Sequence, residues 1–479
     1  MRWIVRLDLE IDGKVIQSRT VGTIDRPTTD LTPEEVGLTL SEGRELVGDI
    51  ERSMISDQVH AYTLGCRACP DCGKVLTDKD VRTKCVKTVH GAYRFRGHRL
   101  RNCPRQIERG YSPAFFPLSE MIPRRTTPEL RYLFAELGSR MPFREVSAVL
   151  DTFGVGGKRA GRMAIWRHTI ALGKMIHEQQ CAAAAGRRRR VERSRGEAIS
   201  IGIDDTYLKG QRCESRQFHV TGGRVERNGR LGDRFAFVAS SPDWKPQQFT
   251  GALLQRGIDS NASVCVISDG DDGLRNFVEK TISANVTQQL DWFHIGMRLE
   301  RLRKAAELPM RYSEFIRHPD AGDPFRRRVA KLREALWLGR PWRGFLQLAR
   351  LQREARHWPY GASERCADAQ RRLDQTIDEF RGYISGNRRA VPNFARARAQ
   401  RRRISTAHVE SVMNHLINHR MSKKQQMRWS PRGAHYLLQV RTEVLNGTLL
   451  ATYRTWHERF RRASRYMTSA NYSPPPPLP

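Results

Sequence analysis

Residues 263–269 read SVCVISD, a nearly all-apolar run that ends in an acid. Such a run is typical of a strand that is buried on both faces within a parallel sheet. Three shorter β-rich runs precede it at intervals that suit an antiparallel meander: AISIGID (198–204), RQFHVTGG (216–223) and RFAFVAS (234–240). A helical stretch separates the third run from SVCVISD. We therefore expect a mixed α/β sheet, with VTQQLDWFH (286–294) as a fifth strand before a helix that starts near Ile295.

Two acids follow these predicted strands. Asp204 is opposite in parity to Ile199, Ile201 and Ile203, so its side chain can leave the packed face, whereas Asp205 has the other parity. Asp269 closes SVCVISD and is a candidate metal ligand, because it follows a buried strand directly in a basic chain. The adjacent Asp271 or Asp272 fits the cap of a following helix better. An aspartate that only hydrogen-bonds a turn is the alternative for Asp204.

A third acid, Glu410, lies far downstream in STAHVESVMNHLINHRMSKKQQMRW (405–429). An apolar stripe at helical spacing runs beside it, formed by Val409, Val412, Met413 and Leu416. The alternative is an ordinary solvated helix glutamate. We expect the nearby side chains to donate hydrogen bonds to phosphates and to offer a surface on which bases stack: His415, His419, Arg420, Lys423, Lys424, Arg428 and Trp429. Two divalent cations held over one phosphodiester need carboxylates from distant parts of a chain, and these three acids fit that need.

The composition indicates a polyanionic partner. Against 51 Asp and Glu stand 84 Lys and Arg, which gives a formal net charge of +33, so nucleic acid is the expected partner. No apolar run approaches the roughly 18 residues of a membrane-spanning helix. The first residues, MRWIVRLDLEIDGK, alternate like a strand with an Asp-Gly hairpin turn and lack the pattern of a signal peptide. We expect no membrane association and a cytoplasmic, nucleoid-associated location.

Nine cysteines, five of them between Cys66 and Cys103, indicate metal ligands in a reducing compartment. CPDCG (69–73) has the C-x2-C spacing of a zinc knuckle, in which the glycine permits the turn. The second half of a zinc ribbon is expected in YRFRGHRLRNCPRQ (93–106), but Gln106 stands where its second thiol would be. Cys69, Cys72 and Cys103 are the predicted Zn²⁺ ligands, with Cys66, Cys85, His90 or His98 as the fourth and Cys66 named tentatively. The alternative is a metal-free ribbon with buried thiols.

Two helical segments, PFREVSAVLDTFG (142–154) and GKRAGRMAIWRHTIALGKMI (157–176), flank a glycine-rich turn. They favour a helix-turn-helix that contacts DNA through Lys158, Arg159, Arg162 and Arg167. An αα-hairpin with solvated arginines fits the same pattern. The arginine block that follows is expected to link two domains and to touch phosphates, through Arg187, Arg188, Arg189 and Arg190.

These patterns divide the chain into six segments. We expect an N-terminal β and zinc-ribbon-like module (1–125), a helical DNA-binding region with an arginine-rich linker (126–195), the first part of the catalytic core (196–300), a helical insertion (301–403), the catalytic helix with the end of the core (404–465), and a proline-rich disordered tail (466–479).

Four blocks resemble bacterial insertion-sequence transposases of the DDE class, most closely the Kra-type family: IGIDDTYLKG (201–210), VISDGDDGL (266–274), LDWFHIGMRLERL (290–302) and HVESVMNHLINHRMSKKQQMRWSPRGA (408–434), with the CPDCG knuckle upstream. The resemblance spans residues 66 to about 450. It implies an α/β ribonuclease H-like core with a helical insertion, and Asp204, Asp269 and Glu410 as a triad for two Mg²⁺ or Mn²⁺ ions. For Asp291 and His294 it leaves two roles open, positioning of DNA and stabilisation of a strand-to-helix junction.

The activity implied by the resemblance is DNA transposition. The partners would be double-stranded DNA, both the terminal inverted repeats of the element and the target, bound by a homo-oligomer of the chain. Metal-dependent cleavage of the element ends would be followed by strand transfer. Two other functions stay open: a ribonuclease H-like nuclease without strand transfer, and a non-enzymatic DNA-binding regulator that uses the zinc knuckle and the helix-turn-helix.

Overall fold

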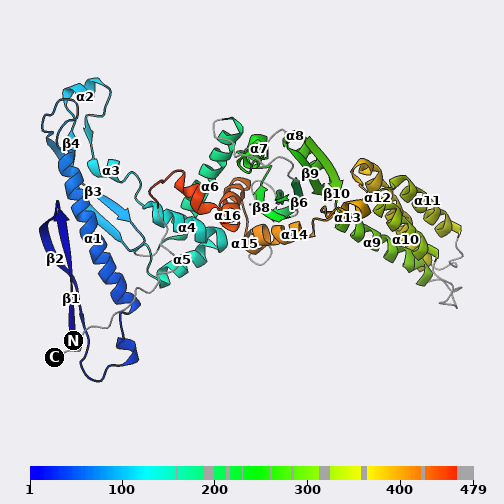
Figure 1. Ribbon diagram of the computed structural model, residues 1–479, viewed down its shortest axis with the longest axis horizontal. Helices are drawn as coiled ribbons and strands as arrows, with labels where there is room; N and C mark the ends of the chain where they lie inside the picture. Colours follow the sequence, from blue (N-terminus) through cyan, green and yellow to red (C-terminus); the bar gives the residue numbers. More distant parts are fainter. Residues whose placement is uncertain are drawn as a thin grey trace. The chain divides into compact units, whose positions relative to one another are not determined.

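A computed structural model of the 479-residue chain describes residues 1–157, 160–186, 199–211, 216–228, 230–258, 262–281, 285–311, 324–357, 364–421 and 427–460 (Figure 1). The chain divides into two compact units, and each is described by itself. Unit 1 comprises Met1–Ile170 and Leu449–Pro479, and unit 2 comprises Ala171–Thr448. The expected proline-rich tail lies outside the described residues.

Unit 1 begins with an antiparallel hairpin of β1 (Arg2–Ile11) and β2 (Lys14–Asp25). Asp12 and Gly13 both have positive φ, 51° and 76°, as the expected tight Asp-Gly turn requires. After a short 3₁₀ turn (η1, Pro33–Glu35) comes α1 (Leu40–Gly65), a 26-residue helix that the sequence analysis missed. A capping box marks its start, because Thr39 and Glu42 each accept a hydrogen bond from the other's backbone N–H.

A three-stranded antiparallel sheet follows, with strands in the order β3 (Asp78–Lys87), β4 (Ala92–Arg101) and β5 (Ala114–Phe115). The expected basic strand is β4, and the two short helices beside it are α2 (Pro104–Glu108) and α3 (Pro117–Met121). The cysteine segment therefore lies between the end of α1 and the beginning of α2.

The predicted helices of residues 128–178 are present as α4 (Pro128–Arg140), α5 (Phe143–Thr152) and α6 (Arg162–Ala184). They share a core that includes Leu130, Phe134, Val146, Leu150 and Ile165. Gly154, Gly156 and Gly157 between α5 and α6 all have positive φ, so glycine is needed for this turn. The helix-turn-helix itself stays a prediction. Tyr453 of α17 (Leu449–Arg454) returns to unit 1 and donates to the carbonyl of Pro128 at 2.8 Å.

Unit 2 contains a five-stranded sheet in the order β10-β9-β6-β7-β8. The strands β6 (Ile199–Lys209), β7 (Gln217–Arg227) and β8 (Arg230–Phe237) form the expected antiparallel meander, and β9 (Ser263–Ser268) and β10 (Asn285–Leu290) run parallel to β6. Two helices make the connections: α7 (Pro246–Gln255) joins β8 to β9, and α8 (Asp272–Thr281) joins β9 to β10. The mixed α/β class and all five predicted strands are confirmed.

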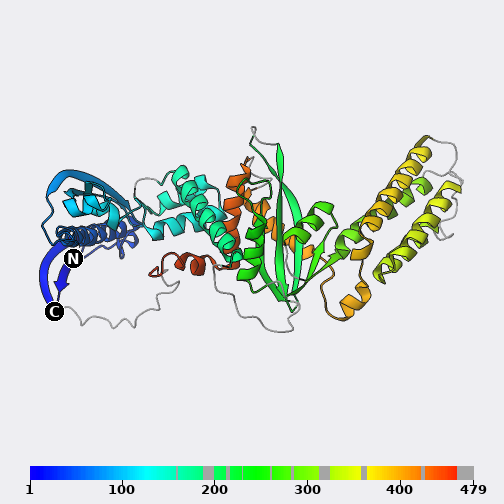
Figure 2. The ribbon, with the colours of Figure 1, turned by 90° about the horizontal axis from the view of Figure 1, so that it is seen from above.

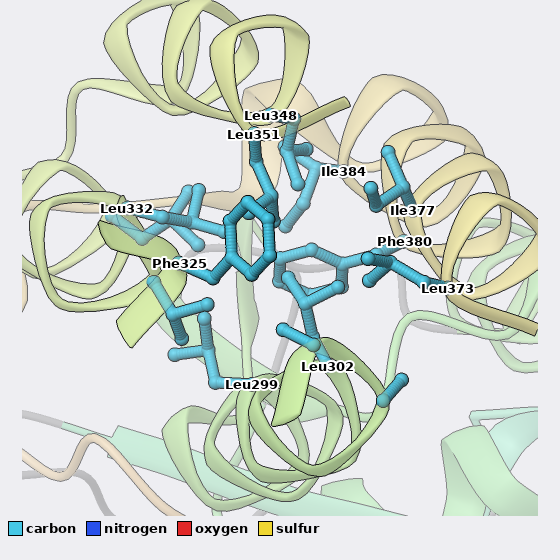
Figure 3. Packing of buried hydrophobic residues seen from close by; sticks show 14 of the residues in the cluster. Leu299, Leu302, Phe325, Leu332, Leu348, Leu351, Leu373, Ile377, Phe380 and Ile384 are labelled. Atoms are coloured by element: carbon cyan, nitrogen blue, oxygen red, sulfur yellow. The ribbon is translucent and has the colours of Figure 1, made fainter. Parts of the chain in front are cut away.

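A helical bundle interrupts the second half of unit 2. It contains α9 (Trp292–Arg311), α10 (Pro324–Trp337), α11 (Pro341–His357), α12 (Glu364–Gly386), a 3₁₀ turn (η2, Arg388–Ala390) and α13 (Phe394–Ala399). Figure 2 shows its long helices running alongside one another. Leu302, Phe325 and Phe380 meet in its centre (Figure 3), where all three are at most 2% exposed. The described residues of the expected helical insertion are largely helical, although the first helix begins at Trp292, before residue 301, and the insertion into a catalytic core stays a prediction.

The chain then returns to the sheet through α14 (Ala407–Met413), a π-helical turn (η3, Asn414–Asn418) and α15 (His419–Met421), and α16 (Pro431–Asn446) packs on β8. The predicted apolar stripe is confirmed as buried, since Val409, Val412, Met413 and Leu416 are at most 4% exposed. Among the helices that the structure describes, none has the length and apolar content needed to span a membrane.

Candidate functional site

Asp204 and Asp269 lie on neighbouring parallel strands. Gly202 of β6 pairs with Ile267 of β9, so two further residues along each strand direction bring Asp204 beside Asp269, where β9 ends while β6 continues to Lys209 instead of ending at Asp204 as expected. The core packs against Ile199, Ile201 and Ile203, and Asp204, of opposite parity, is only half-buried. Gly270 turns the chain directly after Asp269 with a φ of 88°. The structure therefore brings two of the three predicted carboxylates together.

Burial, helped by the nearby carboxylates of Asp269 and Asp205, raises the pKa of Asp204 to about 6. The Asp205 backbone N–H and His294 act in the opposite direction and lower this pKa in part. Burial likewise raises the pKa of Asp205 to about 6, with Asp269 adding to the effect and a hydrogen bond from Thr221 opposing it. A bound cation would favour the ionised form of these acids, so the pair has the electrostatics of a cation site.

Asp205, the next residue of β6, lies on the opposite face of the strand from Asp204. It pairs with Thr221 of β7, and its Oδ1 is buried with no hydrogen-bond partner among the described residues. A buried carboxylate oxygen without a partner is costly unless a cation or a water satisfies it. Either Asp204 or Asp205 could be the first metal ligand, because both lie close enough to Asp269 for its charge to raise their pKa.

Glu410 lies in α14, which packs against β6 and β7. Its side chain is outside the described part of the structure. Three residues later, the Met413 sulfur lies only 2.7 Å from where a Cβ on Gly222 would be, and Gly222 is the β7 partner of Asp204. The helix that carries Glu410 thus crosses the strand pair at the level of Asp204, and glycine at position 222 permits this close approach.

Asp271 has the capping role expected for Asp271 or Asp272. Its Oδ1 accepts hydrogen bonds from the backbone N–H groups of Gly273 at 2.7 Å and Leu274 at 3.3 Å, at the start of α8. Asp269 in turn accepts the Asp271 N–H at 3.0 Å. The loop after β9 is therefore held by its own acids, and Asp269 keeps its second oxygen available for another ligand among the described contacts.

Asp291 joins three segments at the edge of the site. It is fully buried, and its carboxylate accepts hydrogen bonds from the Phe293 N–H at 2.8 Å and from the Thr406 hydroxyl. Its own N–H donates to the Ser268 carbonyl of β9 at 2.8 Å. Of the two roles left open for Asp291, these contacts support stabilisation of the strand-to-helix junction. His294 lies 3.7 Å from the Asp291 carboxylate and close enough to Asp204 to lower its pKa.

Tyr383 of α12 is a site residue that the sequence analysis missed. Its hydroxyl donates to the backbone carbonyl of Asp269 at 2.8 Å, and the Arg298 guanidinium lies 4.0 Å from the centre of its ring. A single tyrosine in a polar helix gives no local signal of such a contact. Tyr383 is therefore one of the bundle side chains that reach the candidate site, beside His294 of α9.

The predicted DNA-contacting residues differ in exposure. Arg162, Arg167 and Arg428 are exposed, and the exposed rings of His415 and His419 stack 5.1 Å apart. Arg420 and Trp429 contradict the expectation of a surface contact: Arg420 is 1% exposed, and its guanidinium packs over the buried Trp429 ring. The burial of this cation–π pair turns both side chains into part of the core. The remaining predicted contacts lie outside the described residues or side chains: Lys158, Arg159, Arg187, Arg188, Arg189, Arg190, Lys423 and Lys424.

The second candidate site is the thiol cluster, Cys69, Cys72 and Cys103, whose sulfur atoms all lie within 4.8 Å of one another. Despite burial, backbone N–H groups of Asp71 and Cys72 and the neighbouring thiols lower the pKa of Cys69. The pKa of Cys103 is raised: the Gln106 N–H lowers it, but burial and the nearby Cys69 and Cys72 outweigh this effect. Three thiols this close together can hold a metal ion such as zinc.

Cys66, Cys85, His90 and His98 were the expected choices for a fourth ligand, and none of them joins this group among the described residues. Cys66 packs against the cluster, but its thiol interacts with the Tyr62 hydroxyl, and burial raises its pKa. The Nδ1 atom of His98 lies 3.2 Å from the Asp78 carboxylate instead. The tentative assignment of Cys66 is therefore not supported by the geometry.

Comparison with protein-family models found no matching family, and no curated protein matched the chain. The functional argument consequently depends on the residues and contacts of the two candidate sites.

Proposed function

We propose that this chain is a DNA transposase of the DDE class, which binds the ends of an insertion sequence and catalyses metal-dependent DNA cleavage and strand transfer. One observation carries the proposal: Asp204 lies within β6 just beyond its pairing with β9, Asp269 directly follows β9, and α14, which contains Glu410, packs across β6 and β7 at the level of Asp204. A three-strand meander followed by two parallel strands agrees with the ribonuclease H-like core that the resemblance implies.

The donor set fits divalent cations. Asp204, Asp269 and Glu410 would hold two Mg²⁺ or Mn²⁺ ions, since hard cations prefer carboxylate oxygens, and a bound cation would offset the burial that raises the pKa of Asp204. Bound there, such ions would activate water and stabilise the leaving oxygen of a phosphodiester. The protein's own part is to orient the carboxylates, through the Asp291 junction and the packing of Met413 on Gly222.

Positive charge on the rest of the chain suits the proposed DNA partner. The net charge of +33 attracts phosphates from a distance, and exposed arginines such as Arg162, Arg167 and Arg428 are available for direct contact. In strand transfer, a freed 3′-hydroxyl attacks a target phosphodiester, so one such bond breaks for each that forms. We also propose that this reaction takes place in the cytoplasm, on nucleoid DNA.

The test is an assay of the purified chain with labelled DNA ends, taken from the inverted repeats that flank its gene, and with Mg²⁺ or Mn²⁺. Cleavage at the element ends and joining to target DNA are the expected products. Cleavage without joining would replace the proposal with a nuclease. Specific binding without cleavage in either metal would replace it with a DNA-binding regulator.

A further inference from the structure

The thiol cluster presents three ligands, and the fourth is identified by comparing its two turns. In the first turn, the backbone N–H of Cys72 points to the Cys69 sulfur, and the side chain of the same residue, three positions after Cys69, is a ligand candidate. In the second turn, the backbone N–H of Gln106 donates to the Cys103 carbonyl at 3.0 Å and lies near enough to the Cys103 thiol to lower its pKa. Gln106 also stands three positions after its cysteine, so its side chain starts from the equivalent place.

The side chain of Gln106 is buried and incompletely satisfied. Gln106 is 8% exposed, and its Oε1 has no hydrogen-bond partner in the part of the chain that the structure describes. Leaving a buried amide oxygen unpaired is unfavourable. Oxygen donors are accepted by Zn²⁺ beside thiolates. A metal ion at the three thiols would remove this cost.

We propose that Gln106 completes the metal site, with Cys69, Cys72 and Cys103 as thiolate ligands and the Gln106 Oε1 as the fourth ligand of a bound Zn²⁺. The residue that breaks the C-x2-C pattern is then a ligand in its own right. Three thiolates and a neutral amide leave the site with one negative charge, whereas four thiolates would leave two.

Metal content and X-ray absorption of the full chain test this proposal. We expect one Zn²⁺ with three sulfur and one oxygen or nitrogen neighbours, and a zinc affinity that falls by about tenfold or more in Gln106→Ala. Gln106→Cys is expected to show four sulfur neighbours. Cys66→Ser is the matched control, and it should leave the sulfur count at three. The proposal is overturned by the absence of zinc, by four sulfurs in the unmodified chain, or by unchanged affinity in Gln106→Ala.

A second inference concerns the outer edge of β1. In the two-stranded sheet, β1 pairs only with β2, and α1 packs against β2. The extra residues that interrupt the pairing, Ile16 and Val21, are both in β2, so β1 itself is regular. Bulges protect an edge against further pairing, and β1 lacks this protection. Trp3, Ile4 and Ile11 on β1 are about half exposed, at 48%, 54% and 52%.

The sequence of β1 complements itself when two copies pair antiparallel about Leu7. Arg6 then stands opposite Asp8 of the second copy, Val5 opposite Leu9, and Trp3 opposite Ile11. A pairing shifted to centre on Asp8 would place this acid opposite itself, and one centred on Arg6 would place two arginines together. Opposite charges across a strand pair stabilise it and like charges destabilise it. We infer that β1 is the contact between two copies of this chain, which form a continuous four-stranded sheet.

Sedimentation of the full chain, without DNA, decides this inference through a charge swap. We expect a dimer that Arg6→Asp or Asp8→Arg each weakens by about tenfold in Kd, because each change places like charges opposite one another. The double variant Arg6→Asp with Asp8→Arg should restore the dimer. Both side chains are exposed, so the monomer fold is kept in all three. A monomeric unmodified chain, insensitive single variants, or a double variant that stays weakened would each overturn the inference.

Discussion

The two candidate metal sites are built in opposite ways. The thiols come from short turns near the end of α1 and the beginning of α2, and two of them, Cys69 and Cys103, are 2% and 8% exposed. The carboxylates come from strands and a helix far apart in the chain, and Asp204 and Asp269 remain half-buried. A closed set of ligands is typical of a structural metal, and an open set is typical of a catalytic one. We therefore expect a metal ion at the thiols to stabilise the fold and metal ions at the carboxylates to support the DNA cleavage reaction.

The largest expected effect is on chemistry. Glu410→Gln, Asp204→Asn and Asp269→Asn should each lower the rate of DNA cleavage by about a thousandfold or more, because the loss of one metal ligand removes several kcal/mol of stabilisation and ~1.4 kcal/mol is a factor of ten. Each variant should stay folded with nearly unchanged DNA affinity, and none should melt below the unmodified chain. Gel assays on labelled ends measure the rate.

The matched control for these variants is Asp271→Asn, which keeps size and retains a capping oxygen at the start of α8. It should cut DNA at a nearly normal rate. Normal cutting by Glu410→Gln would contradict the triad. Glu443 would be the next acid to examine, although its carboxylate already accepts a hydrogen bond from Thr448 at 2.6 Å.

The second prediction addresses the thiol site. Cys103→Ser, or removal of metal by a chelator, should unfold the segment around the cluster, because metal binding there is coupled to folding. Proteolysis between residues 66 and 110 should become rapid, while cleavage within the bundle stays slow. Cys85→Ser changes a half-buried thiol outside the cluster and serves as the control. Equal protection with and without metal would remove the distinction between the two sites.

The third prediction concerns pH in the metal-free chain. Because burial raises the pKa of Asp204 to about 6 from its usual 3.8, the protonated form is favoured by folding. Its contribution to stability is therefore complete below about pH 4 and is lost as the pH rises through about 6. Relative to the unmodified chain, Asp204→Asn should gain about 3 kcal/mol of unfolding free energy across this window. Denaturant titrations measure it, and a constant difference between the two chains contradicts the assigned burial.

The smallest effect is expected at Gly222. A valine there would meet the Met413 sulfur, displace α14 and lower the cleavage rate by about tenfold, since small displacements of a catalytic group are costly. DNA affinity should remain. Gly43→Ala, in α1 with open space around it, is the control and should slightly stabilise the chain. If Gly222→Val cut DNA at the normal rate, α14 would not position the acid that the site needs.

Local patterns in the sequence were enough to predict the strands and the thiols. Ile199, Ile201 and Ile203 alternate at the period of a strand, and C-x2-C spacing is set by one turn, so both signals lie within a few residues. The Asp291–Thr406 hydrogen bond joins residues 115 positions apart, and no local period encodes it. Arg420 was expected at the surface because arginine is charged, but its stacking on Trp429 depends on how two segments fold together.

One contact at the Asp291 junction bears on how such a protein can change over evolution. The Trp292 N–H donates to the Ile404 carbonyl at 2.9 Å, so the chain leaves the sheet and rejoins it at adjacent points. The residues between these two points, including the bundle, form a long connection whose two ends lie side by side. Lengthening, shortening or exchanging parts of that connection need not move the strands that carry Asp204 and Asp269, as long as the Tyr383 hydrogen bond to the Asp269 carbonyl is kept. The bundle is therefore a replaceable module, and relatives of this chain can differ most in size here while retaining the same carboxylates.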